Sequence, residues 1–164
     1  ANNVSKKNPQ KLHELQRRGG DMTNALGPLY TQMLDIAGKI QGMANVAAPV
    51  KAQFDAANKE FDGIRVKFGV PPAQLGAGGG GGGRGGGPAP NEADLAGRVS
   101  TLKSQLLMFH DTPSDTLLRR LTDLRAALPK AMAEANAFLV TKAMQLSAAL
   151  KRHDVALKVP APVK

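Results

Sequence analysis

Residues 112–150 read TPSDTLLRRLTDLRAALPKAMAEANAFLVTKAMQLSAAL, and this stretch decides the fold class. Apolar residues recur in it every three or four positions, at Leu117, Leu121, Leu124, Leu128, Ala131, Ala135 and Phe138. This spacing places them in one stripe on one face of an α-helix. After Phe138 the stripe slips by one residue, to Leu139, Ala143, Leu146 and Leu150. We therefore expect a bend or break in the helix near residues 140–142.

The same spacing recurs in three other segments. The first stripe comprises Leu12, Leu15, Gly19, Met22, Leu26, Leu29, Met33, Ile36, Ile40 and Met43. The second comprises Val50, Phe54, Ala57, Phe61, Ile64 and Phe68, and the third Leu95, Val99, Leu102, Leu106 and Phe109. Four such stripes predict an all-α fold of antiparallel helices, arranged as two helical hairpins that together resemble a four-helix bundle. An aromatic content of only 4% also disfavours a β-sandwich or barrel.

Capping residues indicate where the helices begin and end. Thr112, followed by Pro113 and by Asp115 at the third helical position, predicts the start of the last long helix. Asn91 with Asp94 predicts a similar start for the third stripe. Gly69 follows Phe68 as an expected C-terminal cap.

Two prolines, Pro28 and Pro129, lie inside periodic segments. Because the stripes keep their register through both, we expect kinks rather than helix ends. Gly19 and Gly20 are a further weak point in the first helix.

These signals divide the chain into five segments. We expect a basic N-terminal arm over 1–20, a first helical hairpin over 21–68, a Pro/Gly-rich linker over 69–90, a second hairpin over 91–152 and a basic, proline-containing tail over 153–164. The linker holds the glycine tract 76–87, broken only by Ala77 and Arg84. Because glycine lacks a side chain, this tract can approach another backbone closely. We interpret it as a linker held against its own helices or against a partner chain, without a phosphate-binding role.

The net charge of +9 is concentrated at the two termini. The basic residues expected to contact a partner are Lys6, Lys7, Lys11, Arg17, Arg18, Arg84, Lys151, Arg152, Lys158 and Lys164. Basic termini on a nearly neutral body indicate docking to an acidic protein surface or to anionic lipid head groups. The alternative is that these termini are solvated and serve only solubility.

The sequence contains only weak matches to catalytic or metal-binding motifs. The absence of cysteine excludes disulfides and thiolate chemistry. The acids and the three histidines lack the spacing of a metal site, and we expect no cofactor and no enzymatic activity. His110, Asp111, Ser114 and Asp115 resemble a hydrolytic set, but capping and turn formation explain them more simply. No apolar run approaches the roughly 18 to 20 residues that span a bilayer.

Nucleic-acid binding is a further alternative because the sequence pI is about 10.1. The glycine tract, however, holds one arginine and no aromatic residue, whereas arginine–glycine segments bind through repeated arginines and base stacking. We therefore expect nucleic acid to be an unlikely partner.

The order of helices resembles the C-terminal helical region of exported bacterial proteins with sortilin-type or BNR-repeat β-propellers. The matching features are LYTQMLDIAGKIQ, the helix from Pro49, LAGRVSTLKSQL, the segment from TPSDTLLRRL to NAFL, and the ending LKRHDVALKVPAP. The resemblance covers residues 22–162 and its motifs are helical patterns of low specificity. In that family the propeller carries any glycosidase-like activity, and this chain contains no propeller. The resemblance implies export across the inner membrane and assigns no functional residue.

These observations lead to a specific expectation. We expect a non-catalytic accessory or structural subunit of a larger assembly, at the periplasmic face of a bacterial membrane complex, photosynthetic or respiratory. The alternatives are a processed C-terminal module of an exported propeller protein and a basic nucleic-acid-associated protein.

Overall fold

The computed structural model describes residues 3–70, 93–108 and 114–164, with side chains from residue 10 onward. The α-helices in these ranges are α1 (Asn3–Ile40), α2 (Ala48–Arg65), α3 (Leu95–Met108), α4 (Asp115–Phe138) and α5 (Met144–Lys151). A short 3₁₀ turn, η1 (Val66–Phe68), follows α2, and a π-helical turn, η2 (Leu139–Ala143), joins α4 to α5. The described residues form no strand, so the all-α prediction is confirmed for them.

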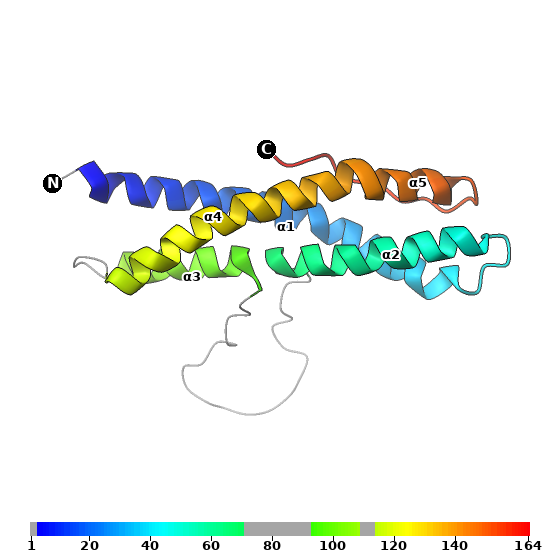
Figure 1. The fold of residues 1–164 in the computed structure, drawn as a ribbon, viewed down its shortest axis with the longest axis horizontal. Coiled ribbons are helices and arrows are strands. Elements are labelled where there is room, and N and C mark those ends of the chain that lie inside the picture. The colour runs from blue at the N-terminus through cyan, green and yellow to red at the C-terminus, as the bar shows by residue number, and fades with distance from the viewer. Residues whose placement is uncertain (1–2, 71–92, 109–113) are drawn as a thin grey trace, which may run out of the picture.

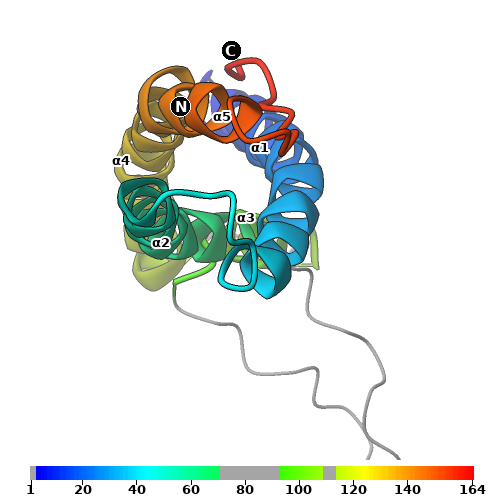
Figure 2. The same ribbon diagram turned by 90° about the vertical axis from the view of Figure 1, so that its right-hand side faces the viewer.

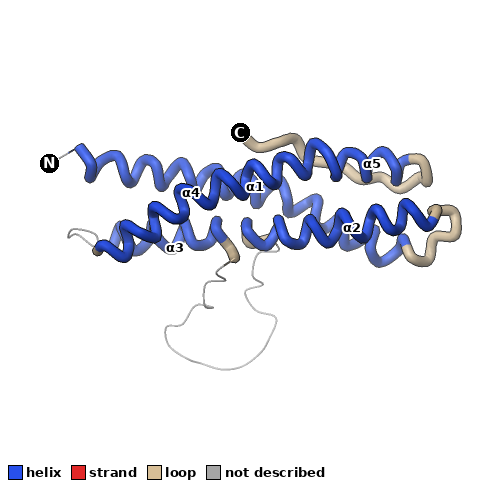
Figure 3. The backbone as a smooth tube through the Cα atoms, viewed as in Figure 1, coloured by secondary structure: helices blue, strands red, loops and turns tan. Residues whose placement is uncertain are grey.

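The helices form three long rods (Figures 1 and 3). The first rod is α1, whose 38 residues extend over about 57 Å. The second consists of α2 and α3, which lie end to end, and the third is the continuous α4, η2 and α5. Viewed along the long axis, the three rods surround a shared centre (Figure 2). The predicted arrangement of two hairpins in a four-helix bundle is not confirmed, because α1 is long enough to pack against both α2 and α3.

The core runs along the whole length of the rods and is built from the predicted stripes. Among the described stripe residues, those of α1 from Leu12 to Ile40 and those of α4 to α5 from Leu117 to Leu150 are all buried. Val50, Leu95 and Leu106 are partly buried and pack against the core. Phe109 lies outside the described residues.

The predicted irregularity near residues 140–142 is the π turn η2. A π turn places one more residue in a helical turn than an α-helix does. The extra residue lets Phe138 and Leu139 both face the core and brings Ala143 back to it. The slip in the stripe and the change in helix type therefore have the same cause.

Two predicted helix starts need correction. The cap of α4 is Ser114, whose hydroxyl accepts a hydrogen bond from Leu117 N at 3.4 Å, and Thr112 lies outside the described residues. The carboxylate of Asp94 accepts a hydrogen bond from Gly97 N at 2.8 Å, so Asp94 rather than Asn91 caps α3. In each case the residue immediately before the helix takes the role, because only its side chain reaches the exposed amides of the first turn. Gly69 does end the 3₁₀ turn, with a left-handed φ of 62°.

Gly19 and Gly20 do not divide α1, and residues 3–20 belong to the same helix as residues 21–40. The physical reason is packing, since a Cβ atom on Gly19 would lie 3.5 Å from Ala96 Cβ. Gly19 thus packs against the start of α3, at a distance where a Cβ would make ordinary van der Waals contact. Pro28 and Pro129 are also accommodated inside continuous helices, as predicted.

The ends of α2 and α3 meet at Gly69 and Asp94. A Cβ atom on Gly69 would lie 2.8 Å from Asp94 Oδ2, and one on Gly97 would lie 2.4 Å from the same atom. The end of α2 and the start of α3 therefore lie directly beside each other. The expected linker, Arg84 included, falls mostly on residues 71–92, which lie outside the described residues.

The C-terminal segment, residues 155–163, packs against the helices. After α5 the chain reverses direction and runs back beside α5 and α1 (Figures 1 and 2). Leu157 is buried, and Val155, Val159 and Val163 pack against the core. We call residues 155–163 the strap.

Candidate functional site

The basic residues proposed from the sequence lie at opposite ends of an elongated molecule. Lys6, Lys7, Lys11, Arg17 and Arg18 belong to the first half of α1, whereas Lys151 and Arg152 close α5 at the other end (Figure 1). Lys158 and Lys164 are exposed on and after the strap. The structure therefore does not join the two basic termini into one surface.

The first end, which we call the α3–α4 end, comprises the described side chains of residues 10–18, 100–108 and 114–123. Its six cations are Lys11, Arg17, Arg18, Lys103, Arg119 and Arg120, and its three acids are Glu14, Asp115 and Asp123. Two of the cations have polar partners within the molecule. Arg17 pairs with Asp21 at 3.4 Å, and Lys103 donates to Gln16 Oε1 at 2.7 Å. Lys11, Arg119 and Arg120 are exposed and make no ion pair among the described residues, so they are available to an external anion.

Exposed apolar side chains gather at the same end. Leu107 and Met108 at the end of α3 are 66% and 79% exposed, and Leu118 in the second turn of α4 is 37% exposed. Exposed large apolar residues beside cations are a common composition of protein-binding surfaces. Sequence reasoning missed these residues, although the dipeptide Leu106-Leu107 already indicated that one of the two must leave the stripe.

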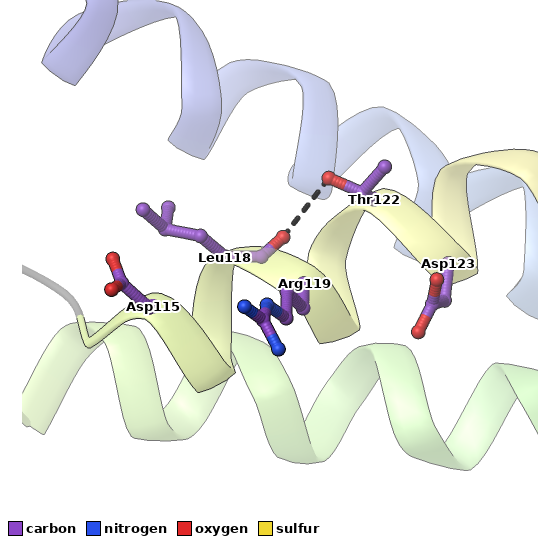
Figure 4. A pocket seen from close by; sticks show the side chains of 5 residues that line it. All are labelled: Asp115, Leu118, Arg119, Thr122 and Asp123. Carbon is purple, nitrogen blue, oxygen red and sulfur yellow. Dashed lines mark hydrogen bonds between the residues drawn. The ribbon is translucent and has the colours of Figure 1, made fainter.

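A shallow hollow lies on α4 at this end and is lined by Asp115, Leu118, Arg119, Thr122 and Asp123 (Figure 4). The Thr122 hydroxyl donates to Leu118 O at 3.0 Å, so it is engaged with its own helix. Charges of both signs line the hollow, which therefore presents a polar contact surface beside the exposed leucine.

The other end, which we call the α5 end, is formed by the loop after α1 and by the turn after α5. Asn45 Nδ2 donates to His153 O at 3.4 Å, which ties the two connections together. Lys51 Nζ donates to Gln41 O at 3.2 Å. Lys151 and Arg152 are exposed here and make no ion pair among the described residues.

Of the four residues weighed for catalysis, the structure describes Ser114 and Asp115, which are neighbours at the start of α4. Ser114 caps α4, His13 lies in the first half of α1 and His153 lies at the α5 end. His110 and Asp111 lie outside the described residues. Within the described ranges no three acidic or histidine side chains form a group that could hold a metal ion. None of the helices described is both long enough and apolar enough to cross a bilayer.

The strap lies against three helices, each of which offers it a polar side chain, and we call this contact surface the groove. Gln32 of α1 accepts from Lys158 N at 2.7 Å and donates to Lys158 O at 3.1 Å. Asn136 of α4 accepts from Val163 N at 2.9 Å and donates to Val163 O at 2.7 Å. Ser147 of α5 donates to Leu157 O at 2.7 Å. Sequence reasoning missed this groove, and the alternation of Val155, Leu157 and Val159 was the available signal.

The chain matches no family model, no curated protein and no solved structure.

Proposed function

We propose that this chain is a non-catalytic structural subunit that docks to an acidic protein surface through its α3–α4 end. The observation that carries the proposal is the coincidence at this end of the exposed Leu107, Met108 and Leu118 with a surplus of cations. Apolar side chains supply the buried centre of an interface, and the surrounding cations orient an acidic partner.

The shape of the molecule supports the same proposal. The hydrophobic core includes residues from all three rods, and the ends of α2 and α3 meet at Gly69 and Asp94. The described helices therefore form one elongated body with a shared core. Such a body separates its two ends by about 57 Å and suits a spacer or brace within a larger assembly. A periplasmic location beside a membrane complex is part of this proposal and derives from the resemblance noted above.

A pair of charge reversals tests the docking surface. The test variant is Arg119→Glu with Arg120→Glu, and the matched control is Lys59→Glu with Lys130→Glu, which reverses two exposed lysines away from this end. Each tagged chain is expressed in its native cells, and the size of its native assembly is measured by sedimentation. We expect the control to remain in a large assembly and the test variant to be released from it.

Measurements on the unmodified chain distinguish the alternatives. Retention of the unmodified chain on phosphatidylglycerol vesicles but not on phosphatidylcholine vesicles would identify lipid head groups as the anionic surface. Salt-sensitive retention on a nucleic-acid column would support the nucleic-acid alternative, and a precursor of propeller size would support the processed-module alternative. If the unmodified chain sediments from gently lysed cells as a 17.2 kDa monomer, the docking proposal is wrong.

A further inference from the structure

The hydrogen bonds from Gln32, Asn136 and Ser147 to the strap all go to backbone atoms of the strap. Gln32 and Asn136 each offer one amide donor and one amide acceptor to the N–H and C=O of a single strap residue. This is the pairing that a neighbouring β-strand would offer to an extended chain. Ser147 satisfies one further carbonyl, that of Leu157. The polar recognition in the groove therefore depends on an extended backbone at a fixed register.

Side-chain packing sets that register. Val155, Leu157 and Val159 occupy alternate positions and pack against the core, as does Val163 further on, whereas Ala156, Lys158, Ala161 and Pro162 are exposed. The helical rise from Asn136 to Ser147 is about 16 Å. The chain from Leu157 to Val163, if extended, spans at most about 20 Å. The strap is thus extended and antiparallel to α5.

The turn after α5, which directs the strap back along its own molecule, contains an unfavourable backbone conformation. Asp154 has φ of 59°, the only positive φ at a non-glycine residue among those described. Val155 N donates to Leu150 O at 3.1 Å, which closes the turn around it. A left-handed conformation is strained for residues that carry a Cβ, although aspartate tolerates it better than most. Asp154 is therefore the residue with a left-handed conformation in the turn that reverses the chain.

We propose that the strap exchanges between two copies of this chain to form a symmetric dimer. If Asp154 becomes extended, the strap continues away from α5 instead of turning back. It then enters the groove of a second copy from that copy's α5 end, in the direction that the groove already accepts. The two copies meet through their α5 ends, and each strap makes with the other copy the contacts that it makes within its own chain. The proposal does not depend on the partner proposed for the α3–α4 end.

A second copy supplies an identical strap to the groove. The groove contacts described above are all made by this strap, and an exchanged strap reproduces every one of them. Lys151 and Arg152 of the two copies would then lie near one another at the junction, where like charges repel. Exchange should therefore become more favourable as salt concentration rises.

Substitution of Asp154 tests the exchange. Asp154→Pro excludes the left-handed turn, because proline fixes φ near −65° and has no N–H. Asp154→Asn is the matched control, because it removes the same charge and still tolerates a left-handed φ. We expect Asp154→Pro to lower the dimer dissociation constant by about tenfold or more relative to Asp154→Asn, as measured by light scattering. The amides of Lys158 and Val163 should stay protected from hydrogen exchange in the dimer.

A third variant tests whether the dimer forms by insertion of the strap into the groove. Leu157→Asp in the Asp154→Pro background should restore a monomer with unprotected strap amides. A dimer that persists in this double variant overturns the proposal, because it would form through another surface. A monomeric Asp154→Pro protein also overturns it, as does equal dimerisation of Asp154→Pro and Asp154→Asn. Occupation of the groove by a different copurifying polypeptide likewise overturns it.

The unmodified chain provides a test that does not depend on the folding of a variant. After refolding from denaturant at high protein concentration, we expect a dimer that returns slowly to monomer on dilution. Its proportion should rise with salt concentration. Monomer alone at every protein and salt concentration overturns the proposal.

Discussion

The rings of Phe61 in α2 and Phe138 in α4 stack with their centroids 5.7 Å apart and their planes 19° apart. Both side chains are buried, and Phe138 is the last residue before the π turn. The contact joins the second and third rods at the point where the apolar stripe changes register. It is flanked by an ion pair between Lys142 and Glu60 on the same two rods.

Phe61→Ala should destabilise the protein by about 3 to 5 kcal/mol, because it removes a fully buried ring and leaves a cavity. Lys59→Ala is the control on the exposed face of the same helix and should change stability by less than about 0.5 kcal/mol. Urea denaturation followed by circular dichroism measures both. Equal stability of the two variants would mean that α2 does not pack on α4 through this face.

Deletion of one residue tests the origin of the π turn. Removal of Thr141 should convert η2 to ordinary α-helix and place the following stripe residues three or four positions apart after Phe138. We expect stability within about 1 kcal/mol of the unmodified chain, since Thr141 is exposed and its hydroxyl bonds only to its own helix.

Removal of Ala126 is the matched control, because it is also exposed but lies in regular α-helix. This deletion rotates every later residue by about 100° and turns the stripe away from the core. The control protein should lose cooperative thermal unfolding. If both deletions unfold the protein, the π turn does not accommodate an inserted residue.

The contact of Gly97 with Asp94 predicts a coupling between two substitutions. Gly97→Ala alone should destabilise, because the new Cβ would lie 2.4 Å from Asp94 Oδ2 and displace the carboxylate that caps α3. In an Asp94→Ala background the same change should stabilise by up to about 1 kcal/mol, because alanine favours a helix more than glycine does. A double-mutant cycle in urea measures this reversal of sign. Additive effects would contradict the described geometry.

Asn136→Ala should release the end of the strap. It removes both hydrogen bonds to Val163 and should cost about 1 to 3 kcal/mol. Hydrogen exchange at the Val163 amide should accelerate, whereas exchange in α2 should change little. Gln145→Ala, on the exposed face of α5, is the control and should leave that amide protected.

The sequence predicted the helices and their buried faces, because apolar spacing is a local property of each helix. It also predicted the irregularity after Phe138, since one slipped position cannot be fitted to a regular helix. It did not predict that α2 and α3 lie end to end. That arrangement depends on long-range contacts such as those of Gly19 with Ala96 and of Gly69 with Asp94, which no local pattern encodes.

The candidate surfaces were predicted less well for a related reason. The basic residues were identifiable, but their separation onto two ends follows from the unbroken course of α1 through Gly19 and Gly20. The strap was interpreted as a basic tail because Lys158 and the prolines dominate its composition. The place where its apolar residues pack is fixed by contacts with Gln32 and Asn136, which lie far away in the sequence.

Site-specific photocrosslinking tests the docking proposal most directly. A benzophenone amino acid is placed at Met108, which is 79% exposed at the α3–α4 end, or at Ala56, which is exposed on α2. In native cells we predict that irradiation joins the Met108 variant to one discrete partner protein and that the Ala56 variant gives no such product. The Arg119→Glu and Arg120→Glu changes should abolish the Met108 product. Absence of a product from Met108, or the same products from both positions, would contradict docking through this end.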